Sequence, residues 1–381
     1  MIKGMEKHTN LPICLTFIGD SITLAYFANL IFSRVSEKRL VRRISIWRLP
    51  SIENDKSLSA DMILVRTGKF LSNYLRRKRY FAMPEWPDSV LKIDQSEALH
   101  QNLSKNTKEY LRKLRKKIKD FEVTIEESHS LEMLETFYYR FYVPFITERQ
   151  GSLAEIQSLS FLKKVFLRGG LLFIKDRSSH IAGVLFLKKP IRLFHFFRWG
   201  VSNTANNTQK KWAGGMLHLL AIEWAKENGY REFNFGGSRP FLNDPILQYK
   251  RKWGTELREN TTQRMVIGLK FLCFKESTFS FLTNNPFIFK HKKDFVGVVP
   301  FTQDDTVSES FELIKKEYNM PGLRGLLVLY RGKLAGYEFD SLKKEENTEF
   351  YPFSKHLYGT DFLKPKFPGR LPHVEGATRT C

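Results

Sequence analysis

The stretch between residues 228 and 254 limits the fold of this chain more than any other. A strand-like run at 231–235 leads directly into Gly236, Gly237 and Ser238. Two glycines after a strand let a ligand approach the backbone closely and leave N–H groups exposed. The basic segment 249–254 follows, and its lysines are close enough in sequence to reach a phosphate or a developing negative charge. The stretch therefore predicts a site for a phosphate-bearing donor.

The formal charge of the chain favours an anionic partner. The 381 residues carry a net charge of +22, and 42% of them are hydrophobic. This length allows two or three domains with their own cores. The charge favours a nucleotide cofactor, RNA or the anionic surface of a membrane as a partner. A soluble protein that is simply basic would have the same composition.

The cysteines and the N-terminal apolar segment bear on the cellular compartment. Cys14, Cys273 and Cys381 are far apart, and no CxxC pair occurs. This usage predicts a reducing cytoplasm and no structural metal. The apolar segment 11–32 is interrupted by Asp20, so it predicts a buried strand and helix more than a membrane anchor or signal.

The order of the predicted elements indicates a mixed α/β domain. A long helix is followed by a second helix, three antiparallel strands, a third helix and a further strand, and Pro144 is expected to kink or break the first helix. The predicted ranges are 131–148, 155–168, 171–175, 181–188, 192–199, 214–228 and 231–235.

Residues 131–257 resemble the second GNAT domain of Fem-type (FemAB-like) transferases and their acetyltransferase-like relatives. The matching motifs are Tyr142-Val143-Pro144-Phe145, Phe197-Arg198-Trp199-Gly200, Trp212-Ala213-Gly214-Gly215, Phe233-Asn234-Phe235-Gly236-Gly237-Ser238 and Lys250-Arg251-Lys252-Trp253-Gly254. The resemblance implies an α/β fold in which helices flank a GNAT-like mixed sheet. It also implies twin GNAT-like domains. We expect a shortened first domain at 1–125, the acyltransferase domain at 126–260 and a C-terminal extension of unknown role at 261–381.

The resemblance also implies a binding site for the donor. GNAT enzymes hold the donor's pyrophosphate on backbone amides at the start of a helix, where the helix dipole favours an anion. The segment just before the predicted helix at 214–228 takes this place. The expected donor-binding residues are Lys210, Lys211, Ala213, Gly214, Gly215, Gly236 and Gly237. A flexible polar turn is the alternative interpretation of the segment.

Lys250 occupies the position of a lysine that stabilises charge during acyl transfer in Fem-type relatives, and Ser238 is the second expected catalytic residue. Arg198, Trp199 and Trp253 are expected to bind the substrate. A general base is not obvious. Glu148, His195 and Asp244 are the candidates, and a core role is favoured for His195.

We therefore expect an N-acyltransferase that moves an acyl group from acyl-CoA to an amine of a sugar, amino acid or peptide, without a metal. An aminoacyl-tRNA donor is the alternative, supported by the basic helix predicted at 99–120. That helix is also compatible with a non-catalytic nucleic-acid-binding module or with peripheral contact to an anionic membrane. A solvated basic face remains its plainer interpretation.

One further motif predicts a different chemistry. The run Phe17-Ile18-Gly19-Asp20-Ser21 is similar to the first block of GDSL-type esterases, in which the serine is the nucleophile. Such an esterase also needs a G-x-N-D block and a D-x-x-H block, and neither occurs. We therefore expect Ser21 to cap a helix, with Asp20 as the other candidate for the cap.

Overall fold

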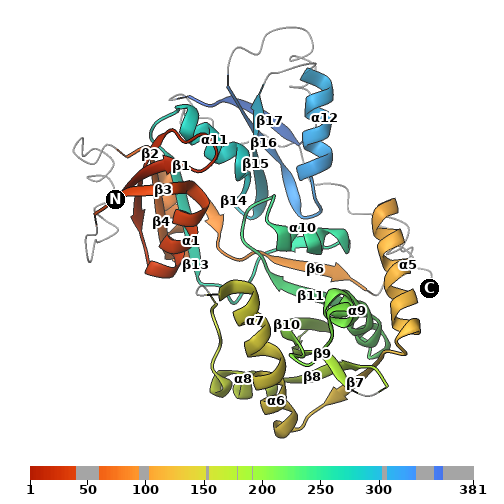
Figure 1. Cartoon of the computed structure of the whole chain (residues 1–381). Helices are drawn as coiled ribbons and strands as arrows, with labels where there is room; N and C mark the ends of the chain where they lie inside the picture. The colour runs from red at the N-terminus through yellow and green to blue at the C-terminus, as the bar shows by residue number, and fades with distance from the viewer. Residues whose placement is uncertain are drawn as a thin grey trace, which may run out of the picture. The chain divides into compact units, whose positions relative to one another are not determined.

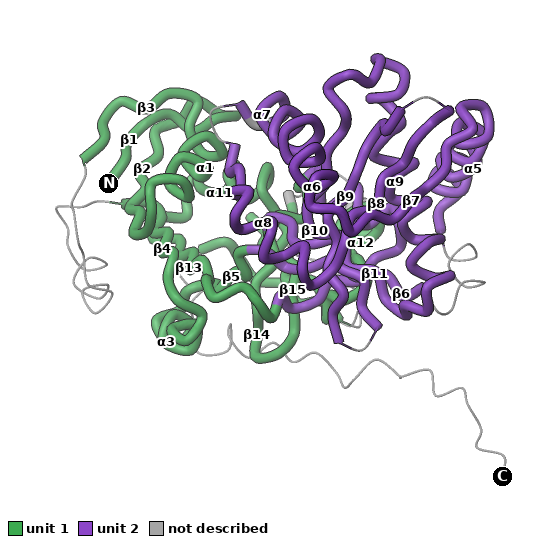
Figure 2. Tube along the Cα trace, turned by 90° about the horizontal axis from the view of Figure 1, so that it is seen from below, with its two compact units in different colours: residues 1–85, 240–244, 261–381 green, residues 86–239, 245–260 purple. Residues whose placement is uncertain are grey.

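A computed structural model describes residues 1–39, 60–93, 103–151, 154–177, 179–190, 192–302, 307–331 and 347–354. The chain forms a mixed α/β structure, as predicted, with its strands in three sheets (Figure 1). It divides into two compact units (Figure 2). Unit 1 comprises residues 1–85, 240–244 and 261–381, and unit 2 comprises residues 86–239 and 245–260. These boundaries differ from the expected segments 1–125, 126–260 and 261–381.

The first sheet of unit 1 joins the N-terminal strands to a strand from beyond residue 260. Its order is β3-β1-β2-β4-β13-β5. The strands are β1 (Ile2–Glu6), β2 (Pro12–Ile18), β3 (Phe32–Lys38), β4 (Met62–Gly68), β5 (Phe81–Pro84) and β13 (Met265–Phe271). Because β13 lies between β4 and β5, the segment expected to begin a separate extension completes this sheet instead.

The apolar segment 11–32 forms a buried strand and a helix, as predicted. Strand β2 is followed by α1 (Ser21–Ile31), and Phe27 and Ile31 of that helix lie in the core of unit 1. Asp20, not Ser21, caps α1, because its carboxylate accepts the N–H groups of Ile22 and Thr23. None of the helices in the described ranges is long and apolar enough to cross a membrane.

The rest of unit 1 contains a second sheet of order β14-β15-β16-β17. Its strands are β14 (Phe287–His291), β15 (Asp294–Thr302), β16 (Leu323–Arg331) and β17 (Thr348–Pro352), with the helices α11 (Glu276–Asn284) and α12 (Val307–Tyr318). The short helices η3 (Lys69–Leu71) and α3 (Ser72–Arg77) connect β4 to β5.

Unit 2 is built on one seven-stranded sheet of order β12-β6-β11-β10-β9-β8-β7. Its strands are β6 (Asp88–Lys92), β7 (Thr124–Ser128), β8 (Gly169–Lys175), β9 (His180–Lys189), β10 (Leu193–Val201), β11 (Glu232–Gly237) and β12 (Glu256–Arg258). Every neighbouring pair is antiparallel except β10 and β11, which are parallel and joined through α9 (Asn207–Glu227). A parallel connection needs such a crossover helix.

Helices cover both faces of this sheet because successive side chains of a strand point to opposite faces. Leu172 and Ile174 of β8 pack with α9 and with α5 (Lys105–Asp120). The alternate residues Leu171 and Phe173 pack with α6 (Leu131–Phe137) and α8 (Leu159–Phe166). A further helix, α10 (Pro245–Lys252), follows β11. The sheet therefore has a helical layer on each side.

The long helix that was expected to kink or break at Pro144 changes its helical type there. The wide π-helical segment η4 (Tyr138–Tyr142) links α6 to α7 (Val143–Gln150), with the proline in the first turn of α7. Proline has no N–H to donate to the carbonyl four residues back. That carbonyl, of Arg140, accepts the N–H of Asn203 at 3.1 Å. The turn between β10 and α9 is thereby attached to this helix.

Helix α9 begins seven residues earlier than the predicted start at 214, at Asn207. Asn206 and Gln209 form a reciprocal capping box, which fixes the start. Gly214 and Gly215 lie inside the helix, where a Cβ would lie 2.9 Å from Trp199 and 2.4 Å from the Tyr110 hydroxyl, respectively. The two glycines therefore allow close packing of α9 against β10 and α5.

Candidate functional site

The parallel strands β10 and β11 stop pairing at the same level of the sheet. In the described part of unit 2, their register ends at the pair His195–Asn234. Beyond it, β10 contains a bulge that makes Phe197 an extra residue opposite β9, and the pairing of β11 with β6 shifts between Asn234 and Gly237. Bulges interrupt the ladder and are common beside active sites. The carboxyl ends of these strands thus form the candidate site.

Lys250 places a buried positive charge at the end of β11. Its side chain lies on α10 and is 6% exposed, and its Nζ donates to the carbonyls of Gly236 and Gly237, both at 2.8 Å. A buried ammonium is costly unless hydrogen bonds compensate for lost water. These two bonds hold the Gly-Gly turn against α10, where the sequence placed the catalytic lysine.

Two backbone N–H groups at the end of β11 donate hydrogen bonds within the protein. The N–H of Gly236 donates to Asn234 Oδ1 at 2.7 Å, and the N–H of Ser238 donates to the Pro87 carbonyl at 3.0 Å. Gly236 has a φ of +79°, which favours glycine, and a Cβ on Gly237 would lie 2.9 Å from Trp86 Cβ. Ser238 is fully buried, and its hydroxyl has no partner within the described ranges. The turn is therefore fixed in shape before any ligand binds.

Asp88 is a buried acid beside this turn that the sequence analysis did not select. Its carboxylate accepts the side-chain amides of Asn234 at 2.8 Å and Asn260 at 2.9 Å. Burial raises the pKa of Asp88, and Asn234, Lys189, Lys250 and Asn260 oppose that rise. The available signal was an acid two residues before the apolar pair Val90 and Leu91. A carboxylate with a raised pKa is a suitable proton acceptor.

His195 lies on β10, level with Asn234. Burial lowers the pKa of His195 to about 3, with further contributions from Lys189, Arg198 and Lys250. The ring is therefore neutral at pH 7. Its Nδ1 is buried and has no hydrogen-bond partner among the described residues, so it is not the satisfied core histidine that the sequence favoured.

A second buried histidine, His218 of α9, was also missed. Its ring is stacked between Phe196 of β10 and Phe235 of β11, with ring centroids 4.3 and 5.2 Å away. Its Nδ1 lies 2.6 Å from the Gly214 carbonyl, and burial lowers the pKa of His218 to about 4. The neutral ring fills the space below the two strand ends. A lone histidine in the apolar run 216–222 was the signal.

The predicted substrate-binding residues have different surroundings. Arg198 Nη1 donates to the Phe197 carbonyl at 2.9 Å, and its guanidinium lies over the Phe197 ring. Trp199 packs against Phe145 with centroids 4.5 Å apart. Trp253 is 3% exposed and belongs to the core around α9. Arg198 therefore lies at the bulge, whereas Trp253 supports the site from within the core.

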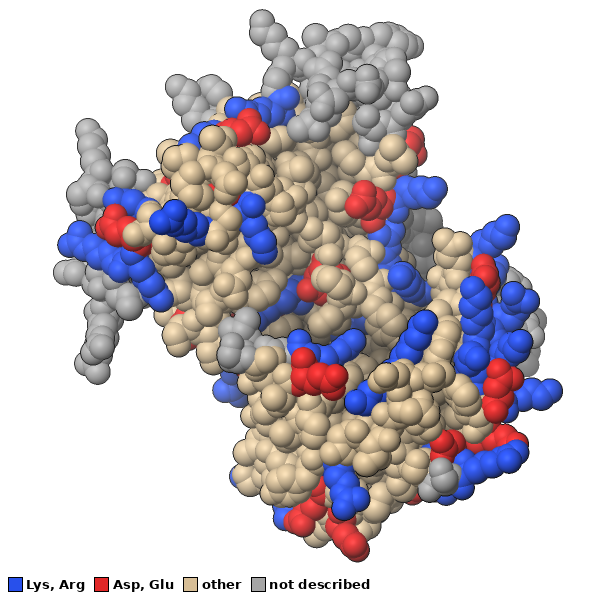
Figure 3. Space-filling model, viewed as in Figure 1, with Lys and Arg blue, Asp and Glu red and all other residues tan. Residues whose placement is uncertain are grey.

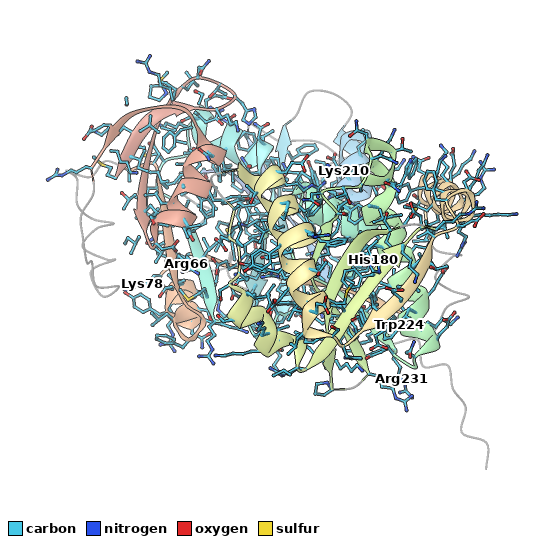
Figure 4. The ribbon with its side chains drawn as sticks, turned by 60° about the horizontal axis from the view of Figure 1, so that its bottom comes forward. Arg66, Lys78, His180, Lys210, Trp224 and Arg231 are labelled. Atoms are coloured by element: carbon cyan, nitrogen blue, oxygen red, sulfur yellow. The ribbon has the colours of Figure 1, made fainter. Side chains whose placement is uncertain are left out.

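The predicted phosphate loop is helical. Lys210 and Lys211 are exposed on the first turns of α9 (Figure 4 labels Lys210), and Ala213 and Gly215 are buried. The backbone between β10 and α9 is instead the turn 202–206. The two lysines follow that turn on the helix and do not lie in a loop. Their predicted role in binding a phosphate stays a prediction.

The other candidates for a base lie elsewhere. Glu148 is exposed on α7, and Asp244 belongs to unit 1. Within the described ranges, no three His, Cys, Asp or Glu side chains gather in a way that could hold a metal ion. Asp88, His195 and Lys250 are among the ionisable groups near the turn, and Lys189 acts electrostatically on the first two.

Comparisons with known proteins add the following similarities. No protein-family model and no curated protein sequence matches the chain. Among solved structures, FemX is 12% identical, with a TM-score of 0.38, covering 70% of this chain and 82% of its own. L-PGS from Bacillus licheniformis is 13% identical, with a TM-score of 0.37 and coverages of 63% and 76%. A GCN5-related N-acetyltransferase from Sphaerobacter thermophilus is 12% identical, with a TM-score of 0.31 and coverages of 59% and 65%.

Proposed function

We propose that unit 2 is an N-acyltransferase that moves an acyl group from acyl-CoA to the amine of a small molecule, sugar or peptide. The observation that carries this proposal is the joint end of β10 and β11, where the buried Lys250 holds the Gly-Gly turn beside the buried Asp88. A site of this kind combines a fixed positive charge, a proton acceptor and strand ends with interrupted pairing. These features suit acyl transfer to an amine, which develops negative charge on the carbonyl oxygen and releases a proton.

The proposed chemistry follows from these groups. The neutral amine attacks the thioester carbonyl, a C–N bond forms, and the C–S bond breaks. The amine proton passes to the Asp88 carboxylate, and the sulfur leaves as a thiolate that takes up a proton. Lys250 stabilises the negative charge that develops on the carbonyl oxygen. Asp88 fits the acceptor role better than His195, because an imidazole with a pKa of about 3 is a weak base.

An aminoacyl-tRNA is the second candidate donor, and helix α5 favours it. One face of α5 is buried through Leu111 and Leu114 against α9, and the helix carries many cations (Figure 3). These cations are Lys105, Lys108, Arg112, Lys113, Arg115, Lys116, Lys117 and Lys119. A helix of this kind suits a phosphate backbone. The same transfer would then break an ester in place of the thioester.

The test is a titration of the purified chain with acetyl-CoA, a long-chain acyl-CoA and charged tRNA at near-physiological salt, followed by release of free thiol or tRNA with amine acceptors. Lys250→Ala is compared with Lys252→Ala, because Lys252 is exposed on the same helix. Binding of an acyl-CoA and transfer that needs Lys250 support the proposal. Binding of charged tRNA alone would identify aminoacyl-tRNA as the donor in place of acyl-CoA. Failure of both donors to bind would refute the proposed acyltransferase activity.

A further inference from the structure

Unit 1 brings together two basic segments that are far apart in the sequence. Residues 76–79 comprise the end of α3 and the two residues after it, and residues 290–293 comprise the end of β14 and the turn before β15. Helix α3 and strand β14 both contact β5, and both lie on the same side of unit 1 (Figure 2). We call the combined surface the α3–β14 basic patch. Its cations are Arg76, Arg77, Lys78, Arg79, Lys290, Lys292 and Lys293.

The charges of the two segments act on each other. His291 lies in the second segment, and its pKa is lowered first by burial and then by the cations Lys292 and Arg76, with Asp294 acting in the opposite direction. The charge of Arg76 therefore acts on His291, at the end of β14. Gathering like charges on one surface is unfavourable unless an anion offsets it. The patch thus has the electrostatics of a docking surface for phosphate groups.

An exposed aromatic residue lies in the short helix that leads into α3. Phe70 lies in η3, directly before α3, and is 84% exposed. A phenylalanine ring so open to water is stabilised when it enters the apolar boundary of a lipid headgroup layer. Proteins that bind single-stranded RNA stack several aromatic rings among their cations. One exposed ring beside a cluster of cations fits a lipid surface better.

We propose that the α3–β14 basic patch, together with Phe70, docks unit 1 on a membrane surface that contains anionic lipids. Clusters of four to eight basic residues bind such surfaces, and an apolar side chain that enters the headgroup boundary adds buried apolar area to this attraction. This binding does not depend on the proposed acyl transfer. It can be measured without a donor or an acceptor.

The experiment is sedimentation of the full chain with vesicles of phosphatidylcholine alone, or with one third phosphatidylglycerol, at near-physiological salt. Arg77→Glu/Lys293→Glu changes two exposed residues of the patch. Lys113→Glu/Lys116→Glu changes two exposed residues of α5 and alters the net charge equally. Each cation contributes about fivefold to the partition onto an anionic surface, so the patch variant should bind at least about 25-fold more weakly. Phe70→Ser should also weaken vesicle binding.

The outcomes separate the proposal from its alternatives. Binding to anionic but not neutral vesicles, with the larger loss in Arg77→Glu/Lys293→Glu, supports it. An equal loss in both double variants overturns it, because net charge would then explain the binding. A parallel titration with a mixed-sequence RNA gives the remaining outcome. If the patch variant loses RNA binding and keeps vesicle binding, the patch is an RNA surface. Absence of vesicle binding also overturns the proposal.

Discussion

Replacing Lys250 by alanine tests the candidate site most directly, because this residue combines a structural and a chemical role. The substitution removes two charge-assisted hydrogen bonds of 2.8 Å to the carbonyls of Gly236 and Gly237. Each such bond contributes about 1.5–3 kcal/mol. Losing the cost of burying the ammonium offsets part of this sum. We therefore expect the free energy of unfolding to fall by about 1–3 kcal/mol.

The expected effect of Lys250→Ala on catalysis is larger than its effect on stability. Removal of one group that stabilises the charge of the transition state lowers kcat about 10²–10³-fold, which corresponds to about 3–4 kcal/mol. Lys252→Ala, on the exposed side of the same helix, should leave both quantities unchanged.

The assay for this pair of variants is free-thiol release with saturating acyl-CoA, alongside urea unfolding of the same samples. The reasoning is refuted if Lys250→Ala keeps the turnover of the unmodified chain while its unfolding midpoint falls. The lysine would then only hold the turn. A loss of turnover that matches the fraction unfolded would lead to the same conclusion.

Three further predictions follow from other residues of the two units. Asp88→Asn should abolish the acidic limb of the pH–rate profile, measured from pH 5 to 8. Because burial raises the folded-state pKa of Asp88, the unmodified chain should also lose stability as pH rises from the ordinary carboxyl pKa to that raised value, and the variant should not. Gly237→Val should weaken binding of the donor in calorimetry, because a Cβ there meets Trp86 at 2.9 Å and displaces the turn, whereas unchanged affinity would place the donor elsewhere. In thermal melts, Asp20→Ala should cost about 0.5–2 kcal/mol through loss of the α1 cap, but Ser21→Ala should cost almost nothing and leave any ester hydrolysis intact.

The sequence predicts the local parts of the site well and its long-range parts poorly. The strand, the Gly-Gly turn and Lys250 lie within 20 residues of one another, so short-range patterns reveal them. Asp88 meets Asn234 across 146 positions of the chain, because β6 pairs with β11. No local pattern encodes that pairing, so the buried acid was missed. The expected domain boundary at residue 260 was misplaced for the same reason, because β13 pairs with the distant strands β4 and β5.

The start of α9 is a different kind of error. The sequence Asn206 to Gln209 is a recognisable capping box, and its two reciprocal hydrogen bonds are both present. The segment that ends at Gly214 and Gly215 was interpreted as a donor-binding loop, so the predicted helix began only at residue 214. Tertiary packing prevailed here, since the close contacts of Gly214 with Trp199 and of Gly215 with α5 need positions without side chains.

The hydrogen bond from the Asn203 N–H to the Arg140 carbonyl shows how Pro144 helps to connect two segments of unit 2. A residue that usually interrupts helices here makes one carbonyl available to a neighbouring turn. The turn between β10 and α9 is therefore attached to η4 because the backbone N–H is missing at Pro144. Any shift of η4 along its axis would pull this turn, and with it the first residues of α9. Two segments separated by about sixty positions are thus coupled by one hydrogen bond, which forms because Pro144 has no N–H to occupy the Arg140 carbonyl.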